Sequence, residues 1–197
     1  SPAGNPGIPT LTRGDYDTPD HHFHERGTDG AQCKHCHAPE RVYMGNDWRA
    51  DHSFRIPRPD LSAVTGAPDA CTTCHTDRDA GWAAAEIAAR FPESAHRSPH
   101  YGLTLSRGRA DPAAAADDLA DLAADRAQPA IVRATALRLL ENAGDATVAE
   151  RLAPLLADED VLVRGAAVGV QRSAGAQDRV LRLLDLLSDP SRSVRTE

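Results

Sequence analysis

Two copies of one five-residue pattern constrain this chain most strongly. Residues 33–37 read CKHCH and residues 71–75 read CTTCH. In a C-x-x-C-H motif the two thiols lie on one side of a helical turn, where they can form thioethers to the two vinyl groups of one porphyrin. The histidine that follows coordinates the iron. The pattern predicts two covalently bound haem c groups, with these attachment residues and proximal ligands: Cys33, Cys36, Cys71, Cys74, His37 and His75.

Three other uses of the four cysteines remain open. Two cysteine pairs could form a Cys₄ zinc site. Four cysteines in an exported chain could form two disulfides, and one pair could act as a redox dithiol. None of these sites requires a histidine directly after both pairs. Because the chain has only nine histidines among 197 residues, the repeated histidine favours haem attachment.

The composition divides the chain into two parts. All nine histidines, all four cysteines and every Phe, Tyr and Trp lie between Tyr16 and Tyr101. The first 110 residues also contain ten of the 14 prolines and ten of the 14 glycines. Proline and glycine interrupt helices and strands, and this part has no long apolar run from which to build a core. We therefore predict an irregular, haem-packed dihaem domain over residues 1–110.

The second part, residues 111–197, shows a repeated helical pattern. Apolar residues recur at helical spacing within segments 111–125, 129–144, 145–158, 160–175 and 176–189, with short polar joints between them. A Val-Arg pair recurs at a step of 31 residues, ending at Arg133, Arg164 and Arg195. This pattern resembles short HEAT-like repeats stacked as an α-solenoid, and an irregular helical bundle is the alternative. The predicted fold class is mainly α, and we expect the three arginines to pair with nearby aspartates.

Charge and hydropathy narrow the range of partners. The net charge is −7 and no basic cluster occurs, which argues against nucleic acid as a partner. No run of 18 apolar residues exists, so we expect no membrane span. The first ten residues have neither the charged nor the apolar region of a signal peptide, although a mature exported chain would have lost one.

Each haem iron has a second axial position, and the chain has many unused histidines. His35 lies inside its own motif and cannot reach the far face of that ring, so we expect it to be exposed or hydrogen-bonded. Met44 is the only methionine and a possible ligand, but with so many histidines nearby it is interpreted as a packing residue. The remaining candidates are His21, His22, His24, His52, His96 and His100.

The run from HHFHERGTDGAQCKHCHAPE through DHSFRIPRP to CTTCH resembles the C-terminal haem pair of pentahaem cytochrome c nitrite reductases. It looks more closely like multihaem cytochromes whose haem segment is followed by helical repeats. The resemblance implies that His24, or His22, is the distal ligand of the haem on the second motif. It implies that His100, or His96, serves the haem on the first motif. Such crossed ligation would clamp the two groups together.

The histidine of the DH pair, His52, has a separate expected role. In the resembled family this histidine reaches a third haem, bound by a motif N-terminal to the pair, whereas this chain has no third C-x-x-C-H. We expect His52 to ligate a haem supplied by another segment or chain, and a hydrogen bond to Asp51 or to a propionate is the alternative. The sequence stops as the next helical repeat begins. We therefore expect a longer polypeptide, or neighbouring chains in a homo- or hetero-oligomer, to cover both ends.

The expected function is electron transfer through haems with His/His axial ligation, which gives lower potentials than His/Met ligation. The partners would be redox proteins and another haem-bearing chain or segment, and no catalytic residue is predicted. Similarity to c-type cytochromes implies a periplasmic or extracellular location, because haem is attached outside the cytoplasm. Two alternatives stay open: an enzyme that reduces a small nitrogen or sulfur oxyanion, and a haem-stabilised docking module.

Overall fold

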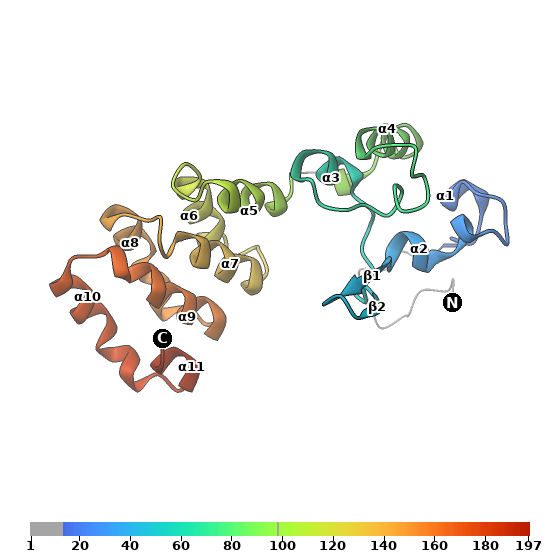
Figure 1. Ribbon diagram of the computed structural model, residues 1–197. Helices are drawn as coiled ribbons and strands as arrows, with labels where there is room; N and C mark the ends of the chain where they lie inside the picture. The colour runs from blue at the N-terminus through green and yellow to red at the C-terminus, as the bar shows by residue number, and fades with distance from the viewer. Residues whose placement is uncertain (1–13, 98) are drawn as a thin grey trace. The chain divides into compact units, whose positions relative to one another are not determined.

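The computed structural model describes residues 14–97 and 99–197 and is mainly helical, which confirms the predicted class at that level (Figure 1). Contacts within the chain divide it into two compact units, between Ser98 and Pro99. This division precedes the domain boundary predicted after residue 110, because the helix Tyr101–Ala110 packs within the second unit. The functional domain assignment itself stays a prediction.

The first unit consists of short helices, one hairpin and connecting loops (Figure 1). Strands β1 and β2 pair antiparallel, with Val42 opposite Trp48. The elements are α1 (Pro19–His22), η1 (Asp29–Ala31), α2 (Cys33–His37), β1 (Glu40–Tyr43), β2 (Asp47–Ala50), α3 (Pro59–Thr65), α4 (Ala80–Arg90) and η2 (Ala95–Arg97).

Helices α3 and α4 pack against each other and form the most regular part of this unit. Helix α3 starts with a proline in its first turn and ends at Gly66, whose φ of 71° fits the left-handed C-cap that glycine adopts without strain. Helix α4 begins after Asp79, whose side chain accepts a hydrogen bond from the Trp82 backbone N–H at 2.7 Å. Local capping therefore fixes the C-terminal end of α3 and the N-terminal end of α4.

The first unit buries very little apolar surface. Among residues 14–97, apart from proline, Ala31 and Ala83 are its buried hydrophobic side chains. Large apolar side chains such as Trp48 and Phe54 are exposed, by 71% and 58%. This low burial agrees with the absence of long apolar runs from this part of the sequence.

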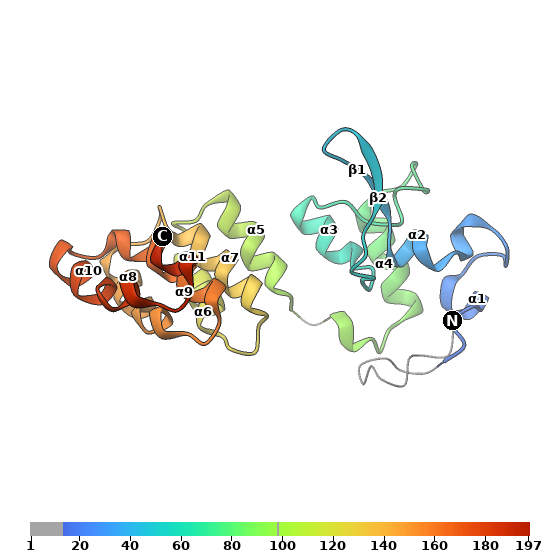
Figure 2. The same ribbon diagram turned by 90° about the horizontal axis from the view of Figure 1, so that it is seen from below.

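The second unit is built almost entirely of helices (Figure 2). Each segment predicted as helical from its apolar spacing contains a helix. The elements are α5 (Tyr101–Ala110), α6 (Ala116–Ala124), α7 (Ala130–Leu140), α8 (Ala146–Leu152), η3 (Ala153–Ala157), α9 (Val161–Val170), η4 (Gln171–Ser173), α10 (Ala176–Leu183), η5 (Asp185–Ser188) and α11 (Arg192–Arg195).

The helices of this unit pack in a regular order around one apolar core. Helices α5, α7, α9 and α11 contact one another in sequence, and α6 contacts both α7 and α8. Leu119, Leu137 and Leu140 are completely buried between them. None of the helices in the described parts of the chain has the length and apolar character needed to cross a membrane.

A polar network recurs through the same unit. Arg133 on α7 pairs with Asp158 at 2.6 Å, and Arg164 on α9 pairs with Asp189 at 2.9 Å. Arg164 also donates to the backbone carbonyl of Asp158 at 2.8 Å, as Arg195 does to that of Asp189 at 2.6 Å. The expected pairing with aspartate is therefore confirmed for Arg133 and Arg164, and Arg195 repeats the backbone contact.

Candidate functional site

The first C-x-x-C-H motif forms helix α2, Cys33–His37. Its two cysteines are three residues apart, so both lie on one helical turn, as the motif predicts. The helix is a single turn that ends when the Ala38 N–H donates to the Lys34 carbonyl at 2.9 Å. This turn presents both thiols and the following imidazole from one short element.

The second motif forms a hydrogen-bonded turn rather than a helix. One carboxylate oxygen of Asp69 accepts the backbone N–H groups of Cys71 and Thr72 at 2.8 and 2.9 Å. The His75 N–H donates to the Cys71 carbonyl at 2.9 Å. Aspartate commonly organises such turns by accepting backbone donors. The turn still places Cys71, Cys74 and His75 within one short loop.

The two motifs lie close to each other, and no disulfide joins their four cysteines. Burial raises the pKa of Cys36, and the neighbouring thiols of Cys74 and Cys33 raise it further. The pKa of Cys71 rises to about 11 through burial, Asp69 and Cys36. Each motif therefore contributes a thiol to the surroundings of the other.

A haem iron takes one protein nitrogen on each face, so pairs of histidines decide whether the residues fit. Among the described residues, no group of three or more His, Cys, Asp and Glu side chains could hold a metal ion. The structure does form two pairs of imidazoles. The ring centres of His24 and His75 are 6.0 Å apart, and those of His21 and His37 are also 6.0 Å apart.

These separations suit axial ligation. Two imidazoles bound on opposite faces of one metal, each at a metal–nitrogen distance of about 2 Å, have ring centres roughly 6 Å apart. The His21 and His37 planes are inclined by 8°, and those of His24 and His75 by 38°. Since rotation about a metal–nitrogen bond leaves the ligand in place, both inclinations are compatible with binding. The two ring separations are therefore compatible with a pair of axial imidazoles on each of two haems.

Hydrogen bonds orient one imidazole of each pair. The Nδ1 atom of His37 lies 2.8 Å from the Arg55 carbonyl oxygen, and Nδ1 of His24 is bonded to the His22 carbonyl oxygen. A carbonyl oxygen only accepts, so both rings donate through Nδ1. This tautomer leaves the lone pair of Nε2 for a metal, and a second-shell contact of this kind is usual for metal-binding histidines.

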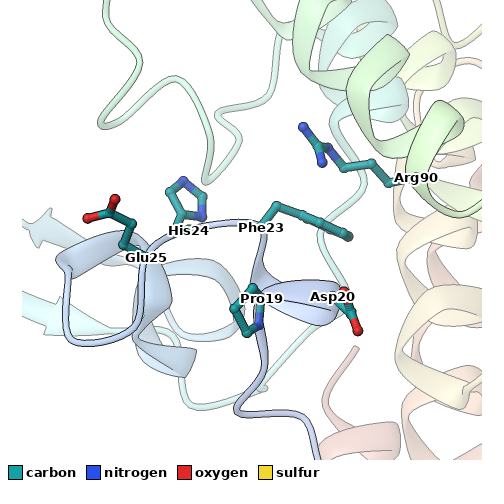
Figure 3. Close-up of a pocket in the computed structure, with 6 residues that line it drawn as sticks. All are labelled: Pro19, Asp20, Phe23, His24, Glu25 and Arg90. Atoms are coloured by element: carbon teal, nitrogen blue, oxygen red, sulfur yellow. The ribbon is translucent and has the colours of Figure 1, made fainter.

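The backbone conformation of Phe23 and the contacts of its ring hold the turn that carries His21 and His24. Phe23 ends α1 in a left-handed conformation, with φ of 60°, and His24 and Phe23 leave the chain in different directions (Figure 3). The Phe23 ring packs on Phe91 at 5.3 Å and beneath the Arg90 guanidinium at 4.4 Å. An open pocket surrounds this turn, and its lining residues are Pro19, Asp20, Phe23, His24, Glu25 and Arg90 (Figure 3).

Close contacts hold the rings of His24 and His75. A Cβ atom added to Gly30 would lie 2.3 Å from Cδ2 of His24, so only glycine lets this ring approach η1. On the other side, the His75 ring packs against Trp82 at 4.9 Å. Both imidazoles of this pair are therefore held by specific neighbours.

Two of the other predicted axial ligands have structural roles. His22 accepts the His24 N–H at Nδ1, and its buried Nε2 lies 3.9 Å from Asp17. His100 belongs to the second unit, where its Nδ1 accepts the Gly102 N–H at 3.0 Å and caps helix α5. His24 is thus the member of the predicted His24/His22 choice that faces His75.

The remaining candidates lie at the surface of the first unit. His96 and His52 are exposed. His35 bonds through Nδ1 to the Asp29 carbonyl at 2.7 Å, as expected. Met44 is 86% exposed in the hairpin turn, so its predicted packing role is wrong. It follows β1 at the tip of the hairpin, where no side chain of the described residues covers it.

The structure adds one residue that the sequence analysis did not choose, His21. Burial lowers the pKa of His21, and the imidazoles of His37 and His22 lower it further, which favours the neutral, metal-binding form. The signal in the sequence was the cluster of three histidines within residues 21–24, beside two haem motifs that need two distal ligands.

Comparison of the chain with protein-family models, with curated proteins and with solved structures finds no match.

Proposed function

We propose that this protein transfers electrons through two haem c groups, attached to Cys33 and Cys36 and to Cys71 and Cys74. The single observation that carries the proposal is the pair His24 and His75, whose ring centres are 6.0 Å apart. It joins the proximal position of the second motif to the distal ligand expected from the sequence. When bound, each haem supplies an iron that carries one electron by changing between its ferric and ferrous states.

The protein's own residues would keep the ligands in place during this change. His37 and His24 each donate Nδ1–H to a backbone carbonyl, which fixes the tautomer and the ring orientation and makes the ligating nitrogen more basic. Two nitrogen ligands, without methionine, favour low reduction potentials. Such fixed ligation supports an electron carrier rather than an open site for a substrate.

We further propose that the second unit is a HEAT-like solenoid and serves as a docking or assembly platform. The support is the recurrence of one packing arrangement after 31 residues: Arg133 with Asp158, then Arg164 with Asp189. The order of helix contacts, α5 to α7 to α9 to α11, agrees with stacked helix pairs. Repeats of this kind offer extended surfaces for a partner.

His52 remains the candidate ligand for a haem held by another segment or chain. Its side chain is exposed. One carboxylate oxygen of Asp51 accepts both the backbone N–H and the hydroxyl of Ser53, at 2.9 and 2.5 Å, and the other lies 3.7 Å from Arg55. Asp51 is therefore engaged by residues other than His52. A location outside the cytoplasm belongs to the same proposal, since it follows from covalent haem attachment.

Visible and electron paramagnetic resonance (EPR) spectra of the oxidised protein test the proposed function. We expect two low-spin ferric haems per chain, because each iron would have two imidazole ligands. A matched variant, Cys71→Ser with Cys74→Ser, should retain one low-spin haem. High-spin iron in both haems, or a chain without haem, would rule out the proposed carrier.

A further inference from the structure

We propose that His21 is the distal ligand of the haem on the first motif, so that the four-residue segment 21–24 ligates both irons. This inference rests on the proposed function, since it assigns a ligand within the same site. It replaces His100, or His96, as the expected ligand of that haem. The two distal positions would then come from one turn of the chain.

The first argument is the geometry of the His21–His37 pair. Its ring separation of 6.0 Å equals that of His24 and His75. Within the described residues no hydrogen bond engages a ring nitrogen of His21, whose ring contacts are with Tyr16 at 5.1 Å and Phe91 at 6.3 Å. The ring is thus positioned by aromatic contacts, and its nitrogens remain available for a metal.

The second argument is what the competing histidines do. The Nδ1 atom of His100 accepts a backbone N–H, so its neutral ring carries the proton on Nε2, the nitrogen that would otherwise bind iron. His22 also accepts a backbone N–H at Nδ1. His96 is exposed in η2, and its backbone carbonyl accepts a hydrogen bond from Arg58. Of the unused imidazoles, His21 alone among the described residues is paired with His37 at the separation that axial ligation needs.

The third argument is the conformation of the segment between the two ligands. His21 lies within α1, and the left-handed conformation of Phe23 ends the helix before His24. In a continued helix, positions 21 and 24 would share one face. The break at Phe23 instead directs one imidazole toward His37 and the other toward His75. A non-glycine residue rarely adopts this backbone conformation, and its packing against Phe91 and Arg90 holds it here.

The test uses the haem-loaded protein with three single substitutions: His21→Ala, His24→Ala and His100→Ala. We expect His21→Ala to convert one of the two low-spin haems, half of the low-spin EPR signal, to high spin. Added imidazole should restore it. His24→Ala should convert the other haem. A double variant that combines His21→Ala with His24→Ala should convert both haems. His100→Ala, the matched control, should keep both haems low-spin.

A His21→Met variant covers the case in which the alanine variant does not accumulate. It should keep both haems six-coordinate while one haem gains a His/Met spectrum and a higher reduction potential. Two unchanged His/His haems in His21→Ala or His21→Met, or a high-spin haem in His100→Ala, would overturn the assignment of His21. Those results would leave the proposed function unaffected. A wild-type chain without covalent haem would contradict both the proposed function and the assignment of His21.

Discussion

Each of the two units of this protein is stabilised by a different kind of internal contact. In the second unit, Leu119, Leu137 and Val163 are completely buried, and helices contact one another through such side chains. In the first unit, ring contacts gather around the histidines of the two motifs, as between Phe54 and His37 or Trp82 and His75. One unit is organised by its apolar periodicity, and the other by aromatic contacts around the motif histidines.

This difference teaches what each half of the sequence had to encode. A helix that buries a leucine stripe needs only local spacing and neighbouring helices of the same kind. A chain segment rich in glycine and proline gains too little from side-chain burial to offset its conformational entropy. Two large apolar porphyrins would supply the missing buried surface. The predictions below test this contrast, beginning with the largest expected effect.

Replacing all four cysteines by serine should separate the two units most clearly. Without thioethers the first unit would lose its haems and its amide protection against hydrogen exchange. The second unit should keep protected amides in α7 and α9, because its core contains no cofactor. Hydrogen exchange followed by mass spectrometry measures both units in one sample. If the first unit kept full amide protection without haem, the proposed difference in how the two units are stabilised would be contradicted.

Arg133→Met should destabilise the second unit while the haem spectra stay unchanged. The substitution leaves the carboxylate of Asp158 buried without its partner, and breaking such a pair costs about 3–5 kcal/mol. Urea unfolding monitored by helix circular dichroism gives the change in the free energy of unfolding. The control is the double variant with Asp158→Leu, which removes both charges and should recover most of the loss. An equal loss in both variants would contradict the role of the pair.

The second unit should also lose stability in acid. Burial alone would raise the pKa of Asp158, but the hydrogen bond from Arg133 and its charge bring it below the ordinary value. A carboxylate with a lowered folded-state pKa stabilises the fold above its unfolded pKa, and that contribution disappears as the pH falls through the folded value. The urea concentration at the unfolding midpoint should therefore decrease as the pH is lowered from about 5 to about 2. The slope should be smaller in the Arg133→Met/Asp158→Leu variant, and an identical slope would contradict this.

Gly30→Ala should have the smallest and most local effect. The added Cβ would lie 2.3 Å from the His24 ring, which must move away from its position opposite His75. We expect a changed EPR signal for the second haem alone, with unfolding of the second unit unaltered. Gly165→Ala in α9 is a suitable control for the haem signals, because its new Cβ would meet only the Glu197 side chain at 3.9 Å. A change in both haems, or in neither, would argue against the His24–His75 pair.

Much of the second unit could be predicted from the sequence because its information is local. Apolar spacing located the helical segments, and the 31-residue step anticipated the pairing of Arg133 and Arg164 with aspartates. The end of the first domain was harder to place. Helix α5 carries an aromatic residue and glycines like the first part, yet Leu105 and Gly108 are buried against the helices of the second unit.

The candidate site was predictable where one motif contains all the information. The proposed attachment residues and both proposed proximal histidines rest on C-x-x-C-H alone. The distal positions depend on contacts across the fold. No spacing rule specifies the left-handed conformation of Phe23, which separates His21 from His24, or the capping role that occupies Nδ1 of His100.

The most direct test of the central claim is the mass of the two motif peptides after proteolysis of the native protein. Protein purified from cells that attach haem c should yield one haem on the peptide with Cys33 and Cys36. The peptide with Cys71 and Cys74 should carry another. Unmodified cysteines on both peptides would contradict the account. So would cysteines that become reactive only after a chelator has removed bound zinc.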